Sequence, residues 1–182
     1  MWANNRTRKI ALAGILLAIS TICVYLTNVL PTSRLAMLAL ASFLSGVLIK
    51  ESGLKIGLGF TLGSIAMAFL VLAGRPIFIL FAVIFAPYGL VRAIIEKVNQ
   101  KFFKIFLKFA YFNLVYFFFL NLFLTLIFNI DGLKRLLGLA DGDLLLYIVL
   151  FVAGNLAFFV YDYVYELVLK FYQERISRIV NK

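Results

Sequence analysis

Long apolar runs, separated by short polar stretches, dominate the pattern of this chain. A helix needs about 20 largely apolar residues to cross the hydrocarbon core of a membrane. Runs near that length cover residues 10–30, 35–49, 56–73, 77–95, 109–130 and 144–168. We therefore predict an all-α integral membrane protein, with six transmembrane helices in one bundle and a single domain over residues 1–182.

The breaks between these runs carry residues that end or bend helices. Pro31 follows the first run, KESGLK separates the second from the third, and GRP follows the third. Pro87 lies in the middle of the fourth run, where it removes a backbone hydrogen bond. Between the fourth and fifth runs, EKVNQKFFKIFLK predicts an amphipathic segment lying at the membrane interface.

Composition supports lipid as the medium. Hydrophobic residues make up 64% of the chain and charged residues only 14%, with a mean hydropathy of +1.05. A soluble domain is about half apolar and about a quarter charged. The net charge of +10 would indicate nucleic acid in a soluble chain, but here the cations flank the apolar runs. We expect the lipid bilayer, and no nucleic acid, as partner.

The chain has few residues that could carry catalysis. It contains one cysteine, Cys23, and no histidine, which excludes an intramolecular disulfide and Ser-His-Asp chemistry. We expect no metal, no cofactor and no enzymatic activity. An enzyme acting on lipid would have only Asp162 and Glu166, against Tyr161 or Lys170, as candidate groups.

The distribution of cations predicts the orientation. Six crossings put both termini on one side, and fourteen of the 18 Lys and Arg residues belong to that side. They are Arg6, Arg8, Lys9, Lys50, Lys55, Arg92, Lys97, Lys101, Lys104, Lys108, Lys170, Arg175, Arg178 and Lys182. The opposite side has four: Arg34, Arg75, Lys134 and Arg135. Short cytoplasmic loops carry the excess of basic residues, so both termini are expected in the cytoplasm.

Two acids interrupt the last apolar run, NLAFFVYDYVYELVLKFY. Asp162 lies about 27 Å along a helix from Leu144, which places it near the cytoplasmic boundary. Intramembrane acids usually find a cation, and Arg92 and Lys97 are expected at the same depth. We predict that Asp162 pairs with one of them and ties the fourth and sixth helices together. The alternative is an acid solvated in the headgroup region.

Small residues recur along the first apolar run, at Ala11, Gly14 and Ala18. Such a stripe lets another backbone approach closely, which favours association of helices in lipid. It is a candidate surface for docking a partner, and packing within the bundle is the alternative.

Polar residues also collect in the outer half of the predicted bundle or near its middle. The candidate ligand-binding residues are Asn28, Ser33, Arg34, Arg75, Tyr88, Asn121 and Asn155. Polar groups at this depth normally face the bundle interior or a water-filled cavity, and arginines suit an anionic ligand. Interfacial anchoring and hydrogen bonds between helices are the alternative for each residue.

The six-run layout, the basic N-terminus and the RKIALAGILLAIS motif resemble the S components of energy-coupling-factor (ECF) vitamin transporters. The stretch LALASFLSGVLIKESGLKIGLGFTLGSIAMAF is similar to the second and third helices of that family. The resemblance implies a subunit of the bacterial plasma membrane that captures a small, vitamin-like solute at its outer half. It also implies that Gly14 and Ala18 dock on a membrane coupling subunit, with ATPases acting in trans.

A different class of function remains open. In size and number of spans, the chain also resembles the membrane partner of bacterial rod-shape complexes, a non-enzymatic scaffold. A scaffold needs packing faces but no cavity, so the lining of any pocket distinguishes the two hypotheses.

The first prediction concerns sidedness. An epitope tag at either terminus is expected to be inaccessible to antibody in intact cells and accessible after permeabilisation, because the basic residues retain both ends inside. A tag that is reached from outside intact cells would contradict the orientation.

Overall fold

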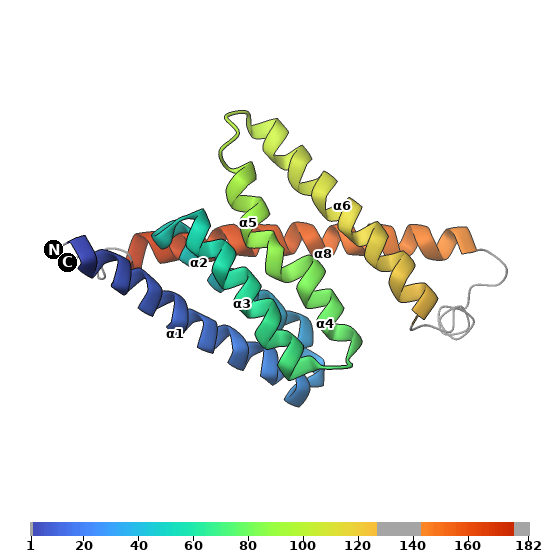
Figure 1. The fold of residues 1–182 in the computed structure, drawn as a ribbon. Helices are drawn as coiled ribbons and strands as arrows, with labels where there is room; N and C mark the ends of the chain where they lie inside the picture. Colours follow the sequence, from blue (N-terminus) through green and yellow to red (C-terminus); the bar gives the residue numbers. More distant parts are fainter. Residues whose placement is uncertain (1, 127–142, 177–182) are drawn as a thin grey trace.

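The computed structural model describes residues 2–126 and 143–176, with side chains at 7–118 and 148–174, and within these ranges the regular elements are all helical. The long helices are α1 (Trp2–Val29), α2 (Arg34–Ser52), α3 (Leu54–Leu72), α6 (Lys101–Leu126) and α8 (Asp143–Phe171). The shorter elements are η1 (Pro31–Ser33), α4 (Pro76–Leu80), η2 (Phe81–Phe85), α5 (Ala86–Ile95) and η3 (Tyr172–Ile176). In Figure 1, α1 to α5 lie together and α8 crosses the bundle obliquely.

Glycines with positive φ form two of the turns. Gly53 has a φ of 88°, and its N–H donates to the carbonyl of Ile49, which ends α2 and lets α3 begin at once. Gly74 has a φ of 74° and lies two residues before Pro76, the first residue of α4. Both conformations are strained for a residue with a Cβ, so glycine is the residue that fits there.

The fourth predicted span is one helical segment, Pro76–Ile95, made of α4, η2 and α5. Within it, η2 is a π-helical turn in which the N–H of Ala86 reaches back to the carbonyl of Phe81. Pro87 follows directly and has no N–H to donate. A π turn before the proline accommodates the missing hydrogen bond without ending the span.

α2 is the most central helix and packs against α1, α3, α5 and α8. Buried side chains form two clusters that meet along it. The first cluster joins α1, α2 and α3 to the fourth span through Val24, Leu38, Ala41, Ala68, Leu72, Phe81 and Ala86. The second joins α2 and α5 to α6 and α8 through Phe43, Val47, Tyr88, Phe112, Phe158, Tyr165 and Leu169. The outward faces carry large exposed apolar side chains, as lipid contact requires.

The all-α class is confirmed for the residues that the structure describes. Five helical segments of the described residues are long and apolar enough to cross a membrane: Thr7–Val29, Pro31–Ser52, Leu54–Leu72, Pro76–Ile95 and Ile148–Glu174. The second is longer than the predicted 35–49, because η1 and α2 follow one another directly. The predicted span 109–130 runs past the described part of α6. The helix begins eight residues earlier, so Lys101–Lys108 belongs to α6.

The second prediction tests the close packing of α5. A Cβ on Gly89 would lie 2.7 Å from Oη of Tyr165 and would also collide with Oγ of Ser45. Gly89→Ala should therefore destabilise the protein by about 1–3 kcal/mol, as overpacking of a filled core does. Gly59→Ala is the control, because its Cβ would meet nothing within 4 Å. Thermal denaturation in detergent, followed by circular dichroism, compares them; equal melting of Gly89→Ala and wild type would contradict the packing.

Candidate functional site

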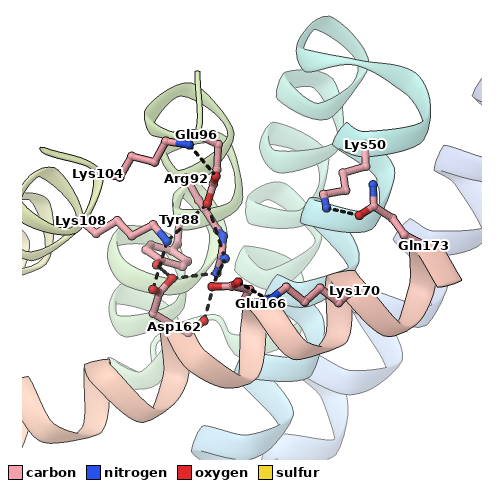
Figure 2. Close-up of polar contacts among 10 residues, drawn as sticks. All are labelled: Lys50, Tyr88, Arg92, Glu96, Lys104, Lys108, Asp162, Glu166, Lys170 and Gln173. Carbon is pink, nitrogen blue, oxygen red and sulfur yellow. Dashed lines mark hydrogen bonds and ion pairs between the residues drawn. The ribbon is translucent and has the colours of Figure 1, made fainter. Parts of the chain in front are cut away.

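The carboxylate of Asp162 on α8 is the centre of a charge cluster that joins three helices (Figure 2). Nη1 of Arg92 on α5 lies 2.7 Å from its Oδ1, and Nζ of Lys108 on α6 lies 3.1 Å from its Oδ2. The hydroxyl of Tyr88, one helical turn before Arg92, donates to the same Oδ1. Both carboxylate oxygens are thus satisfied by side chains from two other helices.

Arg92 is only 3% exposed, so its charge depends on these partners. Nη1 also donates to the backbone carbonyl of Asp162 at 3.1 Å, and the guanidinium lies 5.0 Å from the ring centroid of Tyr165. Its Nη2 lies 3.7 Å from Glu96 and 3.6 Å from Glu166. A buried arginine without such partners costs several kcal/mol, so the cluster stabilises one arrangement of α5 against α8.

The two glutamates form the outer part of the cluster. Glu96 lies 3.4 Å from Lys104 and 3.5 Å from Lys108, and Glu166 lies 2.7 Å from Lys170. Both glutamate side chains are nearly half exposed, and screening by solvent weakens such pairs. The pair of Asp162 with Arg92 therefore dominates the energetics.

The sequence predicts that Asp162 meets Arg92 or Lys97. The structure places Arg92 on the carboxylate, and the second cation there is Lys108, while Lys97 lines a separate cavity near the end of α5. Lys108 was missed because the fifth span was predicted to begin at Phe109. The spacing of Lys101, Lys104 and Lys108, which puts them on one face of a helix, is the signal that could have found it.

Beside the charge cluster, two serines of α2 meet two tyrosines of α8. Oγ of Ser42 donates a hydrogen bond to the carbonyl of Phe85 at 2.7 Å and accepts one from the hydroxyl of Tyr161 at 2.7 Å. The hydroxyl of Tyr165 donates to the carbonyl of Ser42 at 3.2 Å. Phe85 belongs to the π turn, so these bonds connect the bent fourth span to α2 and α8.

An apolar pocket of about 630 Å³ lies between α2, the fourth span, α6 and α8. It is lined by Leu35, Ala36, Ala39, Leu40, Phe43, Leu80, Ile84, Phe85, Phe112, Tyr116, Gly154, Ala157, Phe158, Val160, Tyr161 and Val164. Phe43, Phe112 and Phe158 are buried and form its floor. Leu35, Leu40 and Val160 are exposed, so the rim faces the outside of the bundle between α2 and α8. Six of the lining residues are aromatic, and none is charged.

Two of the residues proposed for an outer ligand site, Asn28 and Arg75, contact each other. Arg75 donates to the side-chain oxygen of Asn28, whose amide donates to the carbonyl of Val71 at 3.4 Å. Ser33 lies in η1 and Arg34 begins α2, and Arg34 is exposed.

The other three candidates lie elsewhere. Tyr88 is buried, and its hydroxyl donates to Asp162. The side-chain amides of Asn155 and of Asn113 on α6 form two hydrogen bonds of 3.1 Å with each other. Asn121 is on α6, with its side chain outside the described residues.

The small residues of α1 point away from the bundle. Ala11, Gly14 and Ala18 are exposed, and a Cβ on Gly14 would meet nothing within 4 Å. Within the described ranges, no group of three Cys, Asp or Glu side chains is arranged to hold a metal ion.

Comparison of the chain with family models, with curated proteins and with solved structures found no match.

The third prediction concerns Asp162→Asn, which removes the charge and keeps the shape. It should lower the free energy of unfolding by about 3 kcal/mol, because it leaves the buried Arg92 with only the longer pairs to the half-exposed Glu96 and Glu166. Glu166→Gln, at a nearly half-exposed acid, should cost less than about 1 kcal/mol. Arg92→Met combined with Asp162→Asn should recover part of the loss. A strictly additive double variant, measured by thermal denaturation in detergent, would refute the coupling.

Proposed function

We propose that this chain is the substrate-capturing, non-enzymatic subunit of a membrane transporter of the ECF type. The observation that carries the proposal is the apolar pocket between α2, the fourth span, α6 and α8. Its volume of about 630 Å³ falls among ligand sites of small molecules, and a scaffold needs no such cavity.

The lining of the pocket favours a lipophilic solute over an anion. Its six aromatic rings offer apolar contact area, and its polar groups are the hydroxyls of Tyr116 and Tyr161. Both hydroxyls already have partners, the carbonyl of Leu150 and the side chain of Ser42. The two arginines expected to bind an anion, Arg34 and Arg75, do not line this pocket, and Arg75 donates to Asn28. We therefore place the solute in the apolar pocket, which begins beside η1 at Leu35.

The exposed rim suggests the route of entry. Because Leu35, Leu40 and Val160 face outward, a lipophilic molecule dissolved in the bilayer would reach the pocket sideways, without crossing water. The proposal includes six spans with both termini in the cytoplasm of a bacterium. This orientation is supported by the basic residues that flank the spans, and with it η1 faces the outside of the cell.

A subunit of this kind needs a partner that supplies energy. The outward face of Ala11, Gly14 and Ala18 on α1 supports docking on a coupling subunit, which would connect the chain to ATPases. The same face also favours the second candidate function, a membrane scaffold of cell-wall synthesis, because a scaffold acts through such surfaces.

The fourth prediction tests capture. The tagged chain is purified in mild detergent, and organic extracts are analysed by mass spectrometry for an enriched lipophilic molecule. Ala157→Phe places an aromatic ring in the space for the solute and should reduce the enriched molecule at least about tenfold, a loss of about 1.4 kcal/mol in binding free energy. Ala153→Phe is the matched control: it lies one turn away on α8, is exposed and does not line the pocket.

The same purification separates the two functions. Co-purified ATPase subunits and an enriched solute that disappears only in Ala157→Phe would support transport. Co-purified cell-wall synthesis proteins, with identical extracts from both variants, would favour the scaffold and contradict capture.

A further inference from the structure

A second cavity, of about 380 Å³, lies at the end of the bundle where α2 and α5 end. Its lining combines apolar and charged residues: Gly46, Ile49, Lys50, Gly53, Leu54, Ala93, Glu96, Lys97 and Leu169. None of them lines the apolar pocket, so the two cavities are separate. Its volume also lies within the range of ligand sites.

The two lysines leave positive charge in this cavity. Among the described side chains, neither Lys50 nor Lys97 has a carboxylate within ion-pairing distance. Nζ of Lys50 donates to the neutral amide oxygen of Gln173 at 2.9 Å (Figure 2). Glu96, the acid of the lining, is already engaged by Arg92, Lys104 and Lys108.

Backbone N–H groups satisfy some of the carbonyls at the ends of these helices. The N–H of Gly53 donates to the carbonyl of Ile49 at 2.9 Å, and that of Glu96 donates to the carbonyl of Arg92 at 2.9 Å. These backbone bonds occupy carbonyls at the ends of α2 and α5 that lysines often neutralise. An ammonium group has three donors, so Lys50 keeps donors for an anion beside its bond to Gln173.

We propose that this cavity binds the phosphate group of an anionic phospholipid. Lys50 and Lys97 would hold the phosphate, while Ile49, Leu54 and Leu169 would contact the first carbons of its acyl chains. Basic cavities between membrane helices are suited to such headgroups, and a mixed apolar and cationic lining matches an amphiphile better than a free ion. The inference concerns a site separate from the captured solute and stands independently of it.

Phosphatidylglycerol is the probe for this site. The full chain in uncharged detergent is titrated with phosphatidylglycerol, and bound lipid is measured by native mass spectrometry. Each lysine near a headgroup contributes about 1 kcal/mol, so Lys50→Gln or Lys97→Gln should weaken binding about fivefold and the double variant about 30-fold. Phosphatidylcholine, which has no net charge, should bind equally weakly to all of them.

The control is the double variant Lys55→Gln and Lys101→Gln, which removes two exposed lysines that do not line the cavity. It should retain phosphatidylglycerol within about twofold, a difference of about 0.4 kcal/mol. Equal losses in both double variants, or equal binding of the two lipids to wild type, would overturn the site. Inorganic phosphate that displaces the lipid at equal concentration would assign the cavity to a free anion and overturn the lipid. The melting temperature and the extracted solute should be unchanged in Lys50→Gln/Lys97→Gln, which separates this test from that of capture.

Discussion

The pairing of a partly buried carboxylate with a buried guanidinium organises half of this bundle. Between helices in lipid, apolar side chains provide no hydrophobic driving force, so association depends on close packing and polar contacts. Asp162 supplies such contacts from α8 to both Arg92 on α5 and Lys108 on α6. Because each charge would be costly alone, the three helices are stable together in this arrangement.

The pocket is built on the same turn of α8. Tyr161 lines the pocket, whereas its neighbour Asp162 points to the charge cluster, since consecutive helical residues face different directions. Tyr88 contacts both, with its hydroxyl on the carboxylate and its ring 5.1 Å from that of Tyr161. The position of the aromatic wall is therefore linked to the ion pair, and the apolar pocket and the structural core share one set of side chains.

Hydropathy predicted the helical class and most of the helix bounds, because an apolar run of membrane length is rare outside a membrane-spanning helix. It placed the start of the fifth run at Phe109, because Lys104 and Lys108 read as polar along the chain. Their partners, Glu96 and Asp162, lie outside α6. The hydropathy of a short stretch of sequence contains no information about ion pairs with residues far along the chain. The pocket was likewise hidden, since its walls are ordinary apolar residues contributed by four segments.

The π turn at Phe81–Phe85 has a consequence for how the two halves of the fourth span are oriented. A π turn holds one more residue than an α turn, so it offsets the helical phase of the residues before it by roughly 100° relative to the residues after it. Phe81 in the first cluster and Tyr88 in the second therefore keep their directions only while that extra residue is present. The number of residues in the segment thus matters as well as their side chains, because it sets the rotation between the contact surfaces on either side.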